Sequence, residues 1–238
     1  MGQEEKIREF WQFAIDVAWD QHRRHPELSR GKCLKERSFL HTLLNGSDSD
    51  VFAEACQVAD SVEDKSAMEV LFPRIFDTAV AGEKRRAADI AGAFEAGRCF
   101  RYTLWENNWC YIHIYNSRQP ESFLADPEYV AENFRYIMDI AGKKDHCDTI
   151  FTVSWLNSLP AFQRFFPEEY LRNMAPSPAG DFGATMGWQG QFINRKGELN
   201  KSAAAKFLEN GVYPLARVES HCSFAALRAH LKNMGLAN

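Results

Sequence analysis

The segment Thr-Ile-Phe-Thr-Val-Ser-Trp-Leu-Asn, residues 149–157, constrains the fold more than any other part of the chain. It is a short, β-branched apolar run that ends in polar residues and lies between two stretches with helical periodicity. Such a run is typical of an inner strand of a mixed or parallel sheet. Ligands of open α/β sheets bind beyond the carboxyl ends of the strands. Because Ser154, Trp155 and Asn157 lie at that end, the sequence predicts a ligand site there.

The first 97 residues have helical periodicity. Apolar side chains recur every three or four positions in several stretches, and capping residues or helix breakers separate these stretches. We find no chemical motif in this part of the chain and expect a helical region at residues 1–97. The helices are expected at residues 4–24, 32–44, 51–60, 61–72 and 82–94.

The sequence changes character after Gly97, where aromatic and β-branched residues become dense. Residues 101–106 and 109–115 flank Asn107-Asn108, which predicts a β-hairpin with a two-residue turn. Counting outward from this turn pairs Leu104 with Tyr111. One face of the hairpin would then carry Tyr102, Leu104, Tyr111, His113 and Tyr115.

The remaining elements alternate between helices and strands. Asp126-Pro127-Glu128 is a helix start, and we expect that helix to run to Ile140 and to end at Gly142. The fold class is α+β, with a helical N-terminal region packed on a mixed sheet through αβα units. Residues 1–97 and 98–238 are expected to form one compact unit. Further helices are expected at residues 160–174, 200–208 and 223–231, and further strands at 188–193 and 212–218.

Composition excludes several classes of protein. The 238 residues carry a net charge of −4 without a basic stripe, which argues against nucleic-acid binding. No run of 18 apolar residues exists, so we expect no membrane span. The six cysteines form no Cys-x-x-Cys pair and no export signal is visible, which predicts free thiols, a cytoplasmic location and no metal site. The oligomeric state is left open.

Two side chains are candidates for catalysis. His113, on an aromatic strand face, could act as a base or as a hydrogen-bonding anchor, or it could be a satisfied core histidine. Ser154 could be a nucleophile, although the Gly-x-Ser-x-Gly elbow is absent and a simple hydrogen-bonding role is the alternative. Asn157 could orient a ligand, or it could cap the following helix.

Other residues are candidates for substrate binding. Gln189 and Gln191 share one face of the expected strand at 188–193, and buried glutamines need hydrogen-bonding partners. Arg101 and Arg118 could hold an anionic group, or they could be surface charges. The loop at residues 175–187 is either a lid or a disordered segment. The aromatic walls of the site would come from Tyr111, Tyr115, Trp155 and Trp188.

The order of these elements resembles that of GNAT-type acyltransferases and of the C-terminal α/β domain appended to some of them. The resemblance rests on residues 111–115, the helix from Asp126, the strand ending in Ser-Trp-Leu, residues 188–192 and the helix from Asn200. It implies an acyltransferase that uses acyl-CoA. The family's phosphate-cradling motif, Arg/Gln-x-x-Gly-x-Gly/Ala, is absent from this chain.

We therefore expect a small-molecule enzyme of specialised or intermediary metabolism, with acyl transfer as the nominal reaction. The competing hypothesis is a non-catalytic protein that binds a small molecule or a partner. The convergence of His113, Ser154, Asn157 and Gln191 near strand ends favours the enzyme. The small number of general acid and base residues favours the binding protein.

Overall fold

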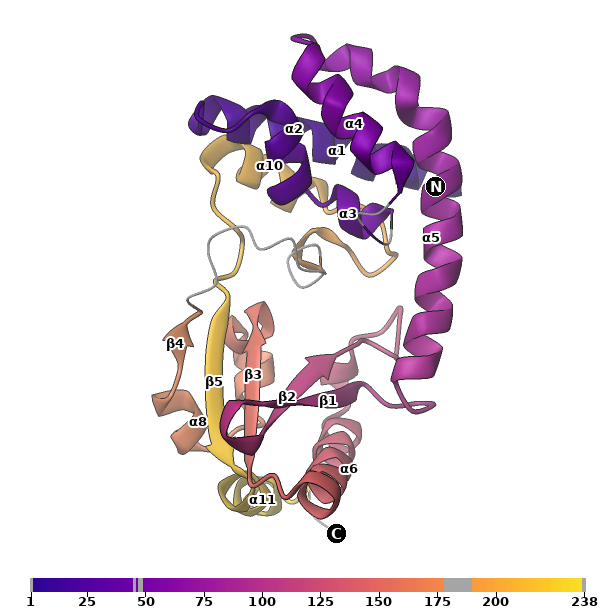
Figure 1. The fold of residues 1–238 in the computed structure, drawn as a ribbon. Coiled ribbons are helices and arrows are strands. Elements are labelled where there is room, and N and C mark those ends of the chain that lie inside the picture. The colour runs from indigo at the N-terminus through magenta and orange to yellow at the C-terminus, as the bar shows by residue number, and fades with distance from the viewer. Residues whose placement is uncertain (1, 45, 47–48, 178–189, 237–238) are drawn as a thin grey trace. The chain divides into compact units, whose positions relative to one another are not determined.

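The computed structural model describes residues 2–44, 46, 49–177 and 190–236 (Figure 1). The chain divides into two compact units. The helical unit comprises Met1–Ile90 and Ala179–Pro214, and the sheet unit comprises Ala91–Pro178 and Leu215–Asn238. The fold class is α+β, as predicted, with helices packed against a mixed five-stranded sheet. No helix in the described ranges is long and apolar enough to cross a membrane.

The helical unit is built around its first helix, which is buried on two sides. Trp11 and Ile15 of this helix pack in one core cluster, and Phe13 and Val17 pack in another. The second cluster contains Phe192, so a segment far along the chain completes this unit. Its elements are α1 (Gln3–Arg24), α2 (Arg30–Glu36), α3 (Leu40–Leu43), α4 (Asp50–Ser61), η1 (Lys65–Leu71), α5 (Phe72–Ala93, which continues into the sheet unit), η5 (Gly190–Phe192) and α10 (Lys201–Asn210).

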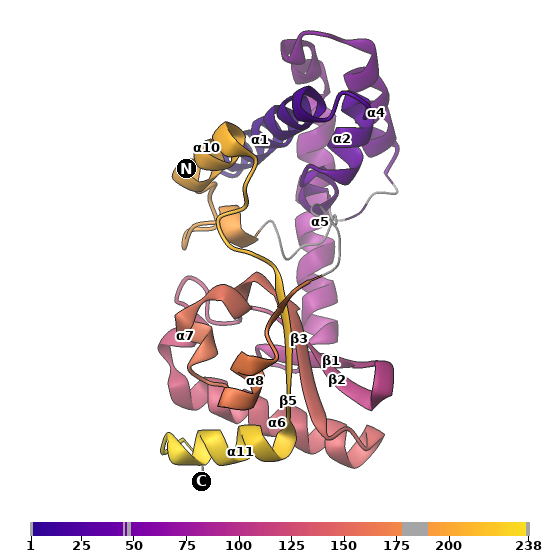
Figure 2. The same cartoon turned by 90° about the vertical axis from the view of Figure 1, so that its left-hand side faces the viewer.

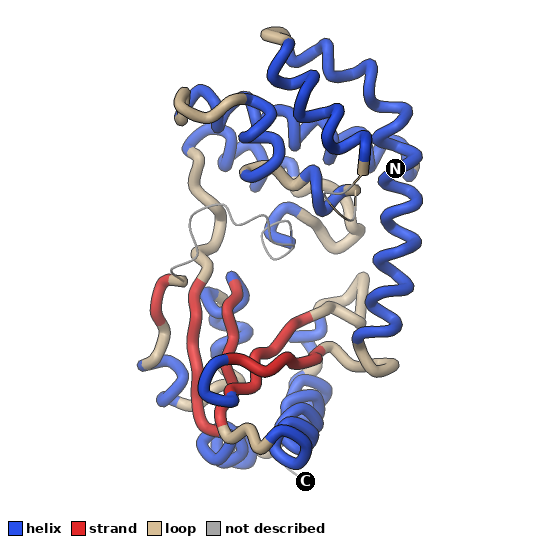
Figure 3. Tube along the Cα trace, viewed as in Figure 1, coloured by secondary structure: helices blue, strands red, loops and turns tan. Residues whose placement is uncertain are grey.

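The sheet unit contains all five strands, in the order β1-β2-β3-β5-β4 (Figure 3). Strands β2 and β3 are parallel, joined by the crossover helix α6, and the other neighbours are antiparallel. The predicted inner strand is confirmed as β3. The elements are β1 (Phe100–Trp105), η2 (Glu106–Asn108), β2 (Trp109–Ile114), η3 (Phe123–Ala125), α6 (Pro127–Asp145), β3 (Thr149–Ser154), η4 (Trp155–Ser158), α7 (Pro160–Gln163), α8 (Glu168–Arg172), β4 (Ala175–Pro176), β5 (Val218–Ser223) and α11 (Phe224–Asn233).

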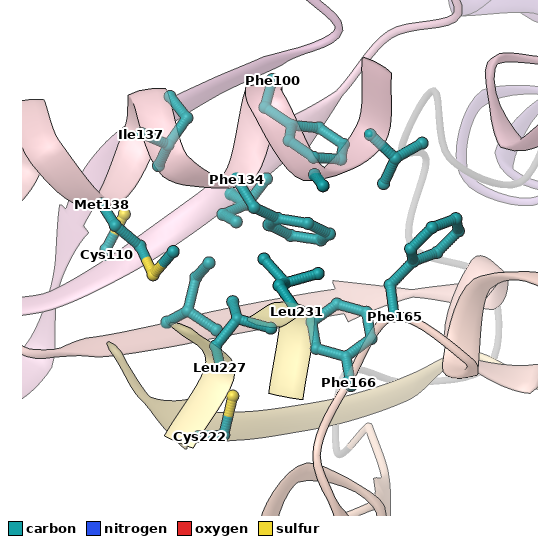
Figure 4. Close-up of a cluster of buried hydrophobic side chains, with 14 of the residues drawn as sticks. Phe100, Cys110, Phe134, Ile137, Met138, Phe165, Phe166, Cys222, Leu227 and Leu231 are labelled. Atoms are coloured by element: carbon teal, nitrogen blue, oxygen red, sulfur yellow. The ribbon is translucent and has the colours of Figure 1, made fainter. Parts of the chain in front are cut away.

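One face of this sheet carries the core of the unit. Cys110 and Ile150 from the strands pack with Phe134 of α6 and Leu227 of α11 (Figure 4). Phe134 is fully buried, with ring centroids 4.7 Å from Phe100 and 5.1 Å from Phe166. The short helices α7 and α8 lie to one side of β3 and β5 (Figure 2) and contribute buried aromatic rings to the same cluster. This face is therefore closed by helices.

The predicted register of the hairpin is wrong by one residue. Leu104 pairs with Cys110, and Thr103 pairs with Tyr111. The turn has three residues, Glu106–Asn108, and both asparagines adopt left-handed conformations with φ near 60°. Because side chains alternate along a strand, this shift moves Tyr102 and Leu104 to the face opposite Tyr111 and His113.

Several helix boundaries also differ from prediction. Pro167 divides the helix expected at 160–174, since proline lacks the N–H that a helix interior needs. Pro73 lies in the first turn of α5, where proline is tolerated. This helix therefore begins at Phe72 and not at the expected residue 82. Gly142 lies inside α6, which ends where His146 takes a left-handed conformation. The stretch at 32–44 is two helices, α2 and α3.

Two predicted strands are misplaced. Residues 190–192, expected in a strand, form the 3₁₀ helix η5, because Phe192 is fully buried among other rings and Gly190 precedes it. The last strand is Val218–Ser223, later than the expected 212–218. The helices at 126, 200 and 223 begin where predicted, each after its capping residue.

Candidate functional site

The second face of the sheet carries a continuous group of aromatic side chains, which we call the aromatic face. Strand pairing puts Tyr111 beside Phe151, and Phe151 beside His221. These residues therefore share one face, and alternate residues such as Cys110 and Ile150 point into the core. The aromatic face comprises Trp105, Trp109, Tyr111, His113, Phe151 and His221.

The rings of the aromatic face touch one another. Phe151 is central, with centroids 5.5 Å from Tyr111, 5.7 Å from Trp109 and 5.8 Å from Trp105. Trp109 stacks on His221 with centroids 4.5 Å apart, and Tyr111 lies 4.7 Å from the His113 ring. Phe151 is only 6% exposed, whereas Trp105 is 47% exposed. Partly exposed rings around a buried one form an apolar surface against which another ring can pack.

His113 lies at one end of this surface in a neutral state. Its Nε2 is 3.0 Å from the hydroxyl of Thr103, the neighbouring side chain on β1. Burial, with a smaller contribution from the positive charge of Arg101, lowers the pKa of His113 from 6.5 to about 4. At neutral pH the ring is therefore uncharged, and it can donate one hydrogen bond and accept another.

Arg101 is the cation of this face. It is paired with His113 in the strand register, and its guanidinium carbon lies 5.5 Å from the centroid of the Phe94 ring. Its Nε is buried without a hydrogen-bond partner. The same face carries one acid on β5, Glu219, which pairs with Val153 two positions beyond Phe151 along β3.

Strands β2 and β3 pair at only two positions. Cys110 pairs with Ile150 and Tyr111 with Phe151, and the pairing stops before the carboxyl ends of either strand. Ligands of α/β sheets bind where neighbouring strands separate in this way. This point lies beside His113, which follows the last paired residue of β2 by two positions.

Ser154 and Trp155 lie away from His113. Ser154 pairs with Val218 and shares the core face with Thr152, so strand alternation directs it away from the aromatic face. Its hydroxyl accepts a hydrogen bond from the N–H of Leu156 and so caps the 3₁₀ helix η4. Trp155 packs against the core cluster. The structure therefore does not bring Ser154 and His113 together on one face.

Asn157 is fully buried in a polar network. Its amide nitrogen donates to the Val218 carbonyl over 2.7 Å and to the Thr152 hydroxyl over 2.8 Å. Its amide oxygen accepts from the hydroxyl of Tyr170 over 2.9 Å. These bonds connect the end of β3 to β5 and α8, which accounts for a buried asparagine by structure alone.

Tyr115 and Arg118 lie in the segment after β2. The Tyr115 ring packs against Phe94, 5.6 Å between centroids. Arg118 forms an ion pair with Asp126 at 2.9 Å and lies over the Tyr129 ring. Asp126 caps α6 by accepting from the N–H of Tyr129, so a carboxylate already compensates the positive end of that helix dipole.

Of the glutamines and tryptophan expected in the site, Gln191 belongs to the helical unit, where it is 8% exposed. Trp188 and Gln189 lie outside the described residues, as does most of the 175–187 loop, of which Ala175–Pro176 forms β4.

The thiols of the chain offer no obvious reactivity. All six cysteines are free. Burial raises the pKa of Cys33 and of Cys56 to about 11, and that of Cys99 to about 12, so these sulfurs are protonated at neutral pH. Within the part of the chain that the structure describes, no three His, Cys, Asp or Glu side chains gather as metal ligands would.

The sequence did not predict that Thr103 contacts His113, or that Trp105, Trp109, Phe151 and His221 share its face of the sheet. The two-residue turn assumed for the hairpin assigned the wrong partners on β1. The usable signal was the alternation of Trp109, Tyr111 and His113 along β2, since every second residue of a strand shares a face.

No protein-family model matches this chain, and comparisons with curated proteins and with solved structures likewise return no match.

Proposed function

We propose that this protein binds a small, planar organic molecule on the aromatic face of its sheet unit. The observation that carries this proposal is the continuous contact of partly exposed rings around Phe151. Small-molecule sites are mainly apolar and aromatic, with a few polar groups that orient the ligand. Here the polar groups would be His113 and Arg101.

The chemistry of the surface favours stacking over acid–base catalysis. A flat ligand would lie against Trp105 and Tyr111, where aromatic contacts contribute about 0.5–1.5 kcal/mol each beyond burial of area. His113, with a pKa of about 4, would act as a neutral hydrogen-bonding partner. Ser154, on the other face, would take no part.

The test uses two neighbouring residues of β1 as a matched pair. Ligand-observed NMR would screen planar aromatic compounds of one to three rings against the wild type, Trp105→Ala and Leu104→Ala. Trp105 is 47% and Leu104 51% exposed, but they lie on opposite faces of the hairpin. We expect Trp105→Ala to lose binding and Leu104→Ala to keep it. Equal effects of the two substitutions, or the absence of any hit, would contradict the proposal.

A second candidate function is transfer of an acyl group, and the arrangement of the strands favours it. The hairpin, the crossover helix α6 and the parallel strand β3 follow the element order of the GNAT-like resemblance, whereas residues 190–192 form the 3₁₀ helix η5 in the helical unit and do not extend the sheet. The separation of β2 from β3 would give a donor access to the sheet. The carboxylate of Asp126 at the start of α6 disfavours donor phosphates at that helix end.

Acyl transfer is tested directly with acetyl-coenzyme A and a panel of primary amines. Free coenzyme A would be measured by chromatography, so that the thiols of the protein do not contribute to the signal. An active transferase should release coenzyme A in an amine-dependent way, and His113→Gln should slow this release at least 10-fold. No amine-dependent release would leave ligand binding as the function.

A further inference from the structure

The aromatic face has a positive charge without a negative partner. Arg101 has no carboxylate within ion-pair distance anywhere in the described ranges, and its Nε is buried without a hydrogen bond. A buried donor without an acceptor is costly, because water no longer satisfies it. An anionic group of a ligand that binds the guanidinium would compensate this charge beside the binding surface.

Other arginines of the sheet unit differ from Arg101 in this respect. Arg98 pairs with Glu132 at 2.8 Å, Arg118 with Asp126 at 2.9 Å and Arg228 with Asp139 at 2.7 Å. Arg164 donates to the carbonyl of Leu124 over 2.7 Å. These four bind protein acceptors, so the state of Arg101 is not a general property of the arginines in this unit.

The position of Arg101 directs its charge to the stacking surface. It is the strand partner of His113, and Thr103, which contacts His113 Nε2, is the next residue of β1 on the same face. The Phe94 ring lies against the guanidinium. An acceptor bound to Arg101 would therefore lie next to the imidazole and at the edge of the aromatic face.

The charge of Arg101 and its surroundings is matched by a ligand group with a single negative charge. Arg101 contributes one positive charge, and His113 is neutral above its pKa of about 4. Glu219 carries a negative charge on the same face, but it lies three strands from Arg101 and does not pair with it. A carboxylate carries one charge and matches the planar fork of a guanidinium, whereas a phosphate dianion would be left undercompensated.

We propose that the ligand of the aromatic face is a planar aromatic carboxylate whose carboxylate group pairs with Arg101. This inference rests on the proposed function, which it extends by naming the class of ligand. The ring of the ligand packs against Trp105 and Tyr111, whose planes are inclined at 63° to each other, and its carboxylate lies between Arg101 and His113.

The test compares 2-naphthoate with 2-naphthamide, which has the same ring and shape but no charge. Calorimetric titration would measure both dissociation constants with the wild type, Arg101→Gln, Arg101→Lys and Trp105→Ala. We expect the wild type to bind the acid at least 10-fold more tightly than the amide, because charge-assisted hydrogen bonds are the stronger ones. Arg101→Gln should remove this preference, and Arg101→Lys should keep part of it. Trp105→Ala should weaken the binding of both compounds.

The outcomes separate this inference from the proposed function. If acid and amide bind the wild type equally, or if Arg101→Gln preserves the preference for the acid, the carboxylate proposal is overturned and planar binding stands. If neither compound binds at millimolar concentration, the carboxylate proposal is overturned, and the screen of planar compounds decides separately whether planar binding stands. A wild-type preference for the acid that disappears between 0.05 M and 0.5 M NaCl supports the ion pair without any substitution.

Discussion

The two faces of the sheet differ in how far helices cover them. The face with Cys110 and Ile150 is covered by helices and packed with phenylalanine rings. The face with Tyr111 and Phe151 is equally rich in rings, but Trp105 at its edge remains nearly half exposed. Both faces belong to the same strands, so strand propensity does not explain the difference. What differs is the covering: helices with complementary apolar stripes lie against one face.

This comparison shows that aromatic residues lie in two different environments in one small sheet. On the covered face, burial of apolar area stabilises the unit. On the aromatic face, the partly exposed rings bury less area, and we propose that they bind a ligand beside Arg101 and His113. Substitutions on the two faces should therefore have separable effects on stability and on binding.

The largest effect is expected on the covered face. Phe134→Ala should lower the free energy of unfolding by about 3–5 kcal/mol, because it removes a fully buried ring and leaves a cavity between Phe100 and Phe166. Urea unfolding followed by circular dichroism would measure this loss. A loss below about 1 kcal/mol would mean that this face is not the core of the unit.

A smaller loss of stability is expected at the end of β3. Asn157→Ala should cost about 2–3 kcal/mol, because it removes the hydrogen bonds of a fully buried amide to the Val218 carbonyl, the Thr152 hydroxyl and the Tyr170 hydroxyl. Asn116→Ala, which removes a solvent-exposed hydrogen bond to the Glu121 carbonyl, is the control. If the Asn157→Ala variant is as stable as the wild type but no longer binds a ligand, Asn157 contacts the ligand and does not stabilise the fold.

The elements that the sequence predicts correctly are those with local signals. Strand β3 has a β-branched run, and the starts of α6, α10 and α11 each have a capping residue. These signals lie within a few residues of the feature they predict. The helical region before residue 97 has long, regular apolar periodicity, which is the strongest signal of this kind.

The features that the sequence does not predict depend on geometry at a distance. The hairpin turn could have two or three residues, and this single choice decides which β1 residues share a face with His113. The 3₁₀ conformation at residues 190–192 follows from packing of Phe192 against Phe13 of the first helix. The place of His113 on β2 follows from a local pattern, whereas its contact with Thr103 depends on the length of the hairpin turn.

The pH dependence of stability tests whether His113 lies in the apolar environment of the aromatic face. Its pKa is about 4 when folded and about 6.5 when unfolded, so the unfolded chain binds more protons between these values. The stabilisation is therefore complete above pH 6.5 and is lost as the pH falls toward 4. Partial exposure reduces its size to about 1–2 kcal/mol.

His113→Gln should remove this part of the pH dependence, which unfolding curves at pH 4.5 and pH 7.5 would measure. His25→Gln, at a side chain that is 39% exposed, is the control. An unchanged difference between the two pH values in His113→Gln would assign the pH dependence to other groups.

The smallest effect on stability is expected at the edge of the aromatic face. Trp105→Ala should change the free energy of unfolding by less than about 1 kcal/mol, because the ring is 47% exposed and its contacts with Tyr111 and Phe151 lie at the rim. Leu104→Ala, with similar exposure on the opposite face, should behave in the same way. The two substitutions are therefore matched in stability and differ only in the face that they alter. Titration of 2-naphthoate against both variants should separate them by at least 10-fold in dissociation constant. A large loss of stability in Trp105→Ala would instead identify the aromatic face as a second core, and the contrast between the two faces would disappear.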